Sequence, residues 1–230
     1  MNEKQLNQFD RIITLVGEEK YNNIASKKVL VVGLGGVGGY VVESLVRSGI
    51  NDITIVDYDT IDITNLNRQI IALHSTIGMK KIDVFKERIL DINPTCNVTT
   101  YDIKLNKDNY KEVLDKKYDY IIDCCDSVDA KKVLLLEAIN TNTPFISSMG
   151  TANRIDPSKL EIIDIRKTSY DPLAKIMRKF VKDEKINKKI MVLASRETPI
   201  KTGTKLGSNS YVPTCAGLLI SSHVLNDIFK

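Results

Sequence analysis

The stretch VLVVGLGGVGGYVVESLVRSGINDITIVDYDTIDITNLNR, residues 29–68, decides the fold. It opens on an unbroken apolar run, which predicts a strand buried on both faces at 28–32. A glycine-rich turn follows, then an expected helix at 36–48 and a second strand at 53–56 that ends before Asp57. Strand, glycine turn, helix and strand in this order form the phosphate-binding unit of dinucleotide-binding folds.

The glycines of this turn have separate tasks. Gly33 permits the tight turn, Gly35 lets a phosphate approach the backbone, and Gly38 allows the helix to pack closely on the strand. Gly36 lies in the same turn, where the helix presents unpaired N–H groups to an anion. The motif predicts a nucleotide or dinucleotide ligand without distinguishing between them.

Strands and helices continue to alternate up to about residue 150. The elements expected there are strands at 98–102, 118–124 and 144–148, and helices at 74–93, 107–114 and 130–140. Strands that alternate with helices form parallel sheets with right-handed crossovers. The sequence therefore predicts an α/β fold with a doubly wound, mostly parallel sheet of the Rossmann-like kind.

After residue 150 the pattern changes, and a smaller C-terminal extension is expected. Its predicted elements are strands at 160–165 and 191–195, a helix at 172–183, a mobile loop at 199–213 and a closing amphipathic helix at 217–229. The chain thus divides into a helical arm at 1–26, a nucleotide-binding Rossmann-like core at 27–150 and a substrate-side region at 151–230. We expect these parts to form one continuous domain.

Composition and charge describe a globular chain of 230 residues, 43% hydrophobic and 27% charged. No run approaches the roughly 18 apolar residues of a membrane span, and residues 1–25 are too polar for a secretory signal, which predicts a cytoplasmic protein. Cys96, Cys124, Cys125 and Cys215 fit reduced thiols better than a disulfide framework. No Cys-x-x-Cys pair occurs, so a tetrahedral zinc site is not expected.

Positive charge is concentrated at 166–189, where nine lysines and arginines stand against three acidic residues, while the net charge of the chain is +4. A basic surface of this kind binds a polyanion such as a nucleic acid, but a solvated helix face produces the same pattern. Composition alone leaves both interpretations open.

Polar residues crowd the exit of the second predicted strand. Asp57 and Asp59 lie where a carboxylate accepts hydrogen bonds from ribose hydroxyls. Arg68 offers a planar fork for phosphate oxygens. The neighbouring amides that can orient the same group are those of Asn65, Asn67 and Gln69.

Two further charged residues are expected at the same edge of the sheet. Lys81, near the start of a helix, can reach the phosphates, and Asp126 follows the buried strand at 118–124. Because ligands of open α/β sheets bind at the carboxyl ends of the strands, Asp126 is placed to hold Mg²⁺ against a triphosphate. This inventory predicts an ATP site, whereas a hydride-transfer enzyme has no evident need of it.

On these motifs the chain resembles the ubiquitin-activating superfamily of ATP-dependent adenylating enzymes, which includes the ThiF, MoeB and HesA proteins. The resemblance implies that a substrate carboxylate attacks the α-phosphate and pyrophosphate leaves, with Arg68 and Lys81 stabilising the charge and Asp126 setting the geometry through Mg²⁺. It also implies a homodimer in which Arg11 of one subunit completes the ATP site of the other. A bound monovalent cation, Na⁺ or K⁺, is allowed, but the sequence does not locate its ligands.

Across almost its full length the chain is similar to the tRNA threonylcarbamoyladenosine dehydratase branch of this superfamily. The most similar segments are 67–75 (NRQIIALHS), 146–150 (ISSMG), 167–169 (KTS) and 171–174 (DPLA). The resemblance implies that the threonyl carboxylate of a modified adenosine beside the tRNA anticodon is adenylated and then cyclises, with net loss of water. The basic segment suits a tRNA bound through its phosphates.

Three other functions stay open. The first is adenylation of the C-terminus of a ubiquitin-like sulfur-carrier protein, although such enzymes generally carry two zinc-binding Cys-x-x-Cys pairs. Cys215, the one candidate for a thioester-forming cysteine, is more simply explained by packing. The second, a redox or NAD-sensing module, leaves Arg68, Lys81 and Asp126 unexplained. The third is a non-enzymatic tRNA-binding partner of a sulfur-transfer system, and a sulfur-transfer protein is also a candidate partner of the enzyme.

Overall fold

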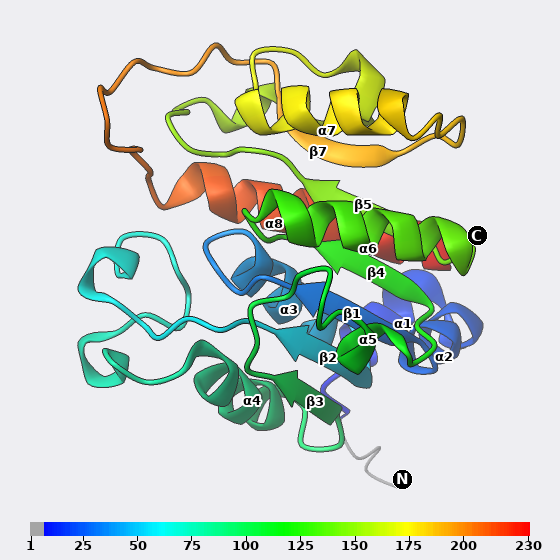
Figure 1. Ribbon diagram of the computed structural model, residues 1–230. Coiled ribbons are helices and arrows are strands. Elements are labelled where there is room, and N and C mark those ends of the chain that lie inside the picture. The colour runs from blue at the N-terminus through cyan, green and yellow to red at the C-terminus, as the bar shows by residue number, and fades with distance from the viewer. Residues whose placement is uncertain (1–6) are drawn as a thin grey trace, which may run out of the picture.

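The computed structural model describes residues 7–230, which form a seven-stranded sheet with helices on both faces (Figure 1). The strands are β1 (Lys28–Val32), β2 (Asp52–Val56), β3 (Asn97–Tyr101), β4 (Tyr120–Asp123), β5 (Phe145–Ser148), β6 (Leu160–Asp164) and β7 (Met191–Ser195). Their order is β3-β2-β1-β4-β5-β7-β6, and every neighbouring pair is parallel except β6 with β7. The predicted doubly wound, mostly parallel sheet is therefore confirmed.

The helices are α1 (Asp10–Val16), α2 (Glu18–Ala25), α3 (Gly38–Arg47), α4 (Lys81–Ile92), α5 (Lys111–Leu114), α6 (Val128–Asn140), α7 (Pro172–Asp183) and α8 (Tyr211–Ile228). The first two are separated by Gly17 with φ 86°. No helix within residues 7–230 combines the length and the apolarity needed to cross a membrane.

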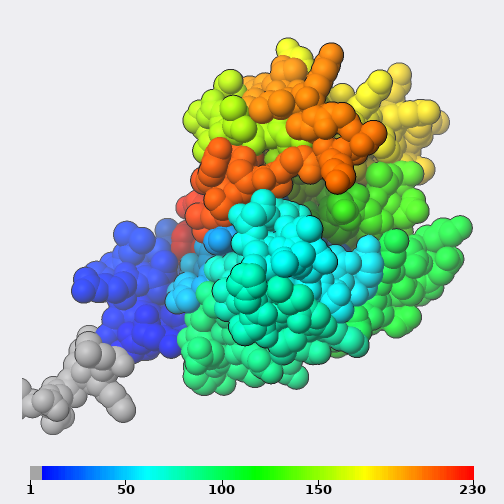
Figure 2. Space-filling model, turned by 90° about the vertical axis from the view of Figure 1, so that its left-hand side faces the viewer, coloured from blue at the N-terminus to red at the C-terminus, as the bar shows by residue number. Residues whose placement is uncertain are grey.

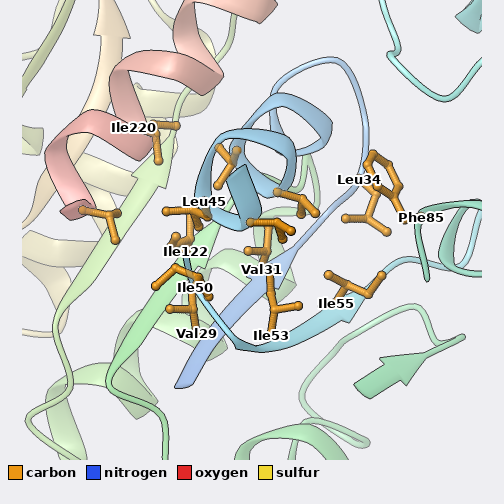
Figure 3. Close-up of a cluster of buried hydrophobic side chains, with 14 of the residues drawn as sticks. Val29, Val31, Leu34, Leu45, Ile50, Ile53, Ile55, Phe85, Ile122 and Ile220 are labelled. Carbon is orange, nitrogen blue, oxygen red and sulfur yellow. The ribbon is translucent and has the colours of Figure 1, made fainter. Parts of the chain in front are cut away.

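Alternate residues of the central strands contribute to two cores. Val29 and Val31 in β1 join the large cluster that includes α3, α4 and α8, part of which Figure 3 shows with Ile53, Ile55 and Ile220. Leu30 and Val32 point to the other face, where they pack with residues of α5 and α6. Burial of one such side chain stabilises the fold by about 1.5–3 kcal/mol, which explains the apolar run at 28–32.

The continuous helix predicted at 74–93 is wrong in its first part. A single 3-10 turn, His74–Thr76, is followed by Gly78 with φ 85°, a conformation that interrupts a helix. Lys80 then forms an isolated β-bridge with Thr60, and α4 begins only at Lys81. The interruption brings the start of α4 back to the exit of β2.

The last helix begins earlier than predicted, at Tyr211 rather than at 217. The Asn209 side chain stabilises this earlier start by accepting a hydrogen bond from the backbone N–H of Val212 at 2.8 Å. Pro213 does not prevent the start, because a proline is tolerated in the first turn of a helix. Gly217 therefore lies inside α8, where a Cβ atom would stand 2.5 Å from the carbonyl oxygen of Val37. Glycine lets α8 cross closely over the start of α3. The outer side of α8 carries exposed Leu218, so the helix is less amphipathic than predicted.

Candidate active site

A cleft of about 980 Å³ lies at the carboxyl ends of β1, β2, β4 and β5. Figure 2, which faces this edge of the sheet, shows a hollow between the cyan segment around residues 60–80 and the orange loop at 196–210. The predicted site residues that line the cleft are Gly33, Gly35, Gly36, Asp57, Asp59, Asn65, Asn67, Arg68, Gln69, Lys81 and Asp126. Gly38 lies behind this lining, and Arg11 is exposed on α1, outside the cleft.

Two glycines of the turn are required by close contacts. Gly33 has φ 89°, and a Cβ atom there would stand 2.7 Å from the backbone nitrogen of Cys125. A Cβ atom on Gly38 would stand only 1.8 Å from the carbonyl oxygen of Gly33. At Gly35 the nearest atom to an added Cβ is the Gln69 amide nitrogen, 3.9 Å away. The turn is therefore closely packed at Gly33 and Gly38, and open to the cleft at Gly35.

Asp57 organises this turn from the end of β2. One carboxylate oxygen accepts a hydrogen bond from the backbone N–H of Leu34 at 2.6 Å, and the other accepts from the N–H of Asp59 at 2.8 Å. Burial raises the pKa of the Asp57 carboxyl, although the positive charge of Lys81 opposes this shift. The side chain therefore holds the loop as well as lining the cleft.

Lys81 is the first residue of α4, and its side chain is only 5% exposed. Its ammonium group donates to the Asp59 carboxylate at 2.8 Å and lies 4.0 Å from Asp57. The side chain of Asp59, in contrast, is 48% exposed. A buried lysine is thus held at the cleft by a partner that water can reach.

The segment after β2 folds back so that its amides and Arg68 meet. One nitrogen of Arg68, Nη1, donates both to the Thr64 carbonyl and to the Asn67 side chain, each at 2.9 Å. Asn65 is engaged in the fold, because its side-chain oxygen accepts from the N–H of Asp62 and caps a short 3-10 turn. Gln69 is buried beside the glycine turn, and its side-chain oxygen has no partner among the described residues.

Asp126 follows β4, which lies on the other side of β1 from β2. Its side chain is exposed within the cleft lining. Cys124 and Cys125 also line the cleft just after β4, which ends at Asp123, one residue earlier than predicted. Burial raises the pKa of both thiols well above the usual range. Within residues 7–230, no three or more His, Cys, Asp or Glu side chains gather closely enough to hold a metal ion by themselves.

The sequence analysis missed the wall of the cleft that follows β5. Asp171 caps α7 by accepting from the N–H of Ala174 at 3.0 Å, and its other oxygen accepts from the N–H of Gly150 at 2.7 Å. Arg154 lies between these segments and is only 3% exposed. An Asp-Pro pair before a helical pattern was the available signal for the cap, but nothing local marked Arg154.

A buried ion pair behind the cleft was also missed. The Lys131 ammonium group donates to Asp123 at 3.0 Å, to Ser147 at 3.2 Å and to the Ser148 carbonyl at 2.7 Å. Ser147 and the thiol of Cys125 also donate to the Asp123 carboxylate. Both charged side chains are fully buried. Every member has partners, so the cluster ties together the ends of β4 and β5.

Only some of the basic residues at 166–189 are available on the surface. Lys175, Lys179 and Lys182 are exposed on α7, which Figure 1 shows at the outer edge of the molecule. Arg166 and Arg178 instead donate to backbone carbonyls, those of Ile186 and Thr168 among them. The lysines are therefore the groups available to a polyanion.

Comparisons with known proteins agree with this geometry. A family model described as ThiF family matches residues 9–221. The tRNA threonylcarbamoyladenosine dehydratase of Bacillus subtilis (strain 168) is 39% identical over 243 residues, covering 98% of this chain and 96% of that protein. The enzyme of the same name from Escherichia coli (strain K12) is 38% identical over 77% of this chain and 66% of its own length. The solved structure of the E. coli dehydratase TcdA in complex with ATP superposes with a TM-score of 0.90 at 34% identity, covering 96% of this chain and 93% of that chain.

Proposed function

Because this chain belongs to the ThiF family, we propose that it is an ATP-dependent tRNA threonylcarbamoyladenosine dehydratase. The observation that carries the proposal is the similarity to a dehydratase over 98% of the chain, which includes the basic substrate-side region and not only the nucleotide-binding core. The reaction proceeds in two steps. The threonyl carboxylate attacks the α-phosphate of ATP and releases pyrophosphate. The carbamoyl group then attacks the activated carbonyl, which closes the ring and displaces AMP.

The residues between the glycine turn and α4 bind ATP in this proposal. The open backbone at Gly35 and the N-terminus of α3 receive phosphate oxygens, and Asp57 lies beside the ribose. Arg68 and Lys81 stabilise negative charge on the transferring phosphoryl group. Lys81 can do so because its partner Asp59 can exchange the ammonium group for water.

We assign Mg²⁺ to Asp126. Mg²⁺ is commonly held by one or two carboxylates together with substrate phosphates, so a single exposed carboxylate in the cleft fits the ion. When bound, the ion neutralises phosphate charge. Asp126→Ala should lose AMP formation and should not recover it when Mg²⁺ is raised; full recovery would contradict this assignment.

We propose a homodimer in which Arg11 reaches the partner's cleft. Arg11 is exposed on α1 and does not line its own cleft, and Leu15 on the same helix is 79% exposed. An apolar side chain beside a basic one suits a subunit interface. Mixing inactive Arg11→Ala and Arg68→Ala chains should restore activity, because a mixed dimer contains one intact site. Continued inactivity of a refolded mixture would count against the dimer.

A tRNA substrate gives the exposed lysines of α7 a partner and fits the cytoplasmic location that we propose. Phosphate contacts release counterions, so binding should weaken steeply as salt is raised. The monovalent cation and the sulfur-transfer partner that the family resemblance allows stay predictions.

The deciding experiment supplies the purified protein with ATP, Mg²⁺ and tRNA that carries threonylcarbamoyladenosine, followed by mass analysis of the digested nucleosides. The proposal requires that this nucleoside loses one water while AMP appears. Unchanged nucleoside mass would overturn it. AMP formation that depends on a Gly-Gly-tailed carrier protein, and not on tRNA, would instead establish the carrier-adenylating alternative.

A further inference from the structure

The wall of the cleft after β5 contains a guanidinium group that the proposed ATP site does not use. Arg154 lines the cleft and is nine-tenths or more buried. Its Nε and Nη1 atoms are shielded from solvent and have no hydrogen-bond partner in the described part of the chain. Leaving a buried charged donor without a partner costs free energy, so an occupied cleft should supply one.

The acidic residues near Arg154 do not provide that partner. Asp171 and Glu197 are the two carboxylates whose charges act on the guanidinium group. Asp171 already accepts two backbone N–H groups, and Glu197 accepts from the N–H groups of Ile155 and Asp156. They offset the charge of Arg154, but no hydrogen bond joins either of them to it in residues 7–230.

The backbone around Arg154 is held by hydrogen bonds to a neighbouring loop, whereas its guanidinium group makes few. The Asn153 N–H donates to Gly207 at 2.8 Å, and the side chain of Asn209 donates to the Arg154 carbonyl at 2.7 Å, so the 196–210 loop binds this segment. The guanidinium group makes one hydrogen bond, from Nη2 to the Tyr170 carbonyl at 3.2 Å. If the guanidinium group turns into the cleft, it breaks only the hydrogen bond from Nη2 to Tyr170. The unpartnered Nε and Nη1 atoms can then find an acceptor.

Arg154 and the cations of the proposed triphosphate site follow different strands. Arg68 and Lys81 come from the segment after β2, whereas Arg154 comes from the segment after β5, three strands away in the order β2-β1-β4-β5. At the usual strand spacing the ends of β2 and β5 are about 14 Å apart, and the 196–210 loop bridges the two segments by binding Asn67 and Arg154. A planar fork matches an oxyanion with two oxygens, either a carboxylate or a phosphate. The triphosphate has its own cations, so the carboxylate is the remaining acceptor.

We infer that Arg154 binds the carboxylate of the substrate and places it for attack on the α-phosphate. This inference rests on the proposed function, in which the carboxylate is that of the threonylcarbamoyl group. Arg154 is thus a specificity-determining residue: it recognises the modification, while the lysines of α7 bind the tRNA backbone.

The test changes the Arg154 side chain and the threonylcarbamoyl group separately and together, and asks whether their effects on binding depend on each other. Binding is measured for tRNA with the threonylcarbamoyl group and for the same tRNA with plain adenosine at that position, using wild type, Arg154→Gln and Arg154→Lys. The wild type should prefer the modified tRNA. Arg154→Gln should lose roughly 10-fold or more of that preference, the usual effect of removing a hydrogen-bonded charge partner, while ATP affinity stays within about twofold.

Arg178→Gln is the matched control, because Arg178 lies on α7 and donates to the Thr168 carbonyl and hydroxyl. It should change binding of both tRNAs equally. If Arg154→Gln does not fold, Arg154→Lys, which keeps the charge but not the fork, should still lose most of the preference. Full preference in a folded Arg154 variant would overturn the inference, and so would loss of ATP affinity, which would identify a phosphate. A wild type that neither discriminates nor converts the tRNAs would refute the proposed function itself.

Discussion

Two lysine–aspartate pairs lie at the carboxyl edge of the same sheet, and they differ in exposure. Lys131 and Asp123 are 3.0 Å apart, and both side chains are fully buried. Lys81 and Asp59 are 2.8 Å apart, but nearly half of the Asp59 side chain is exposed. The first pair is completed by neighbouring serines and backbone, whereas the second opens on the cleft.

The difference indicates which lysine can change partner. A buried charge that loses its partner cannot be hydrated, so the Lys131 pair is fixed in one arrangement. Asp59 can be hydrated when Lys81 leaves it, and Lys81 is then available to a phosphate. The residue types and the nitrogen–oxygen distances are alike in the two pairs. Burial of the aspartate and the additional partners of Lys131 distinguish the structural pair from the one that we propose to be functional.

The largest expected effect is on stability. Lys131→Met leaves Asp123 as an uncompensated buried charge, which should lower the free energy of unfolding by about 3–5 kcal/mol. Chemical denaturation measures this change. The double variant Lys131→Met with Asp123→Leu should recover much of the loss, since an apolar pair has no charge to satisfy. A single variant as stable as wild type would remove the contrast between the two pairs.

Arg68→Ala should act on the reaction and leave the fold intact. Loss of one donor to the transferring phosphoryl group should lower the rate of AMP formation by about 10²-fold or more. The free energy of unfolding should stay within about 0.5 kcal/mol, because Arg68 is only half-buried and bonds to its own loop. Arg68→Lys keeps the charge without the fork and should be intermediate. Near-normal turnover of Arg68→Ala would contradict its role.

Lys81→Met provides the direct counterpart of Lys131→Met. The rate of AMP formation should fall by about 10²-fold, as for other charge-stabilising donors. Stability should fall by less than in Lys131→Met, because the exposed Asp59 regains water and the buried Asp57, which loses a neighbouring positive charge, keeps its two backbone N–H donors. Parallel denaturation curves of the two variants check the comparison: equal losses of stability would mean that the exposure of Asp59 makes no difference.

The smallest effect concerns pH. Since the pKa of Asp57 is raised in the folded protein, the native state takes up this proton at a higher pH than the unfolded chain does. Asp57 therefore contributes stability that is present below its unfolded pKa and is lost as pH rises through the folded value. Lys81→Met removes a charge that lowers the pKa of Asp57, so this loss should move to higher pH.

Unfolding measured from pH 4 to 7 should show the shift as a difference between Lys81→Met and wild type. The difference should disappear when Asp57→Asn is added to both chains. A difference that persists without Asp57 would assign the effect to another carboxyl group.

Local patterns predicted the parts of the site that are built from local contacts. Gly33 and Gly38 meet each other within one turn, and Lys81 begins a helix close to the strand exit in sequence as well as in space. Arg154 and Lys131 were missed because their environments come from distant segments: Arg154 is covered by the 196–210 loop, and Lys131 is satisfied by the end of β5. A lone arginine in a polar stretch has no pattern that marks it as buried.

The same reason explains the errors at the boundaries of elements. The interruption before α4 depends on a bridge between Thr60 and Lys80, and the early start of α8 depends on Asn209. The sequence pattern predicts a helix start at Gly217, but this glycine is required by the approach of Val37, just before α3, to the middle of α8. Hydrophobic periodicity describes which face is buried and not what it is buried against.

The contact between Gly217 and Val37 has a consequence for how the protein is made. A ribosome delivers the chain from its N-terminus, so the glycine turn emerges roughly 180 residues before the helix that packs on its back. During that interval the apolar side of α3 lacks its cover, and the turn lacks the wall that keeps it tight. Nucleotide binding should therefore be acquired only when α8 has left the ribosome, however early the phosphate-binding motif was synthesised.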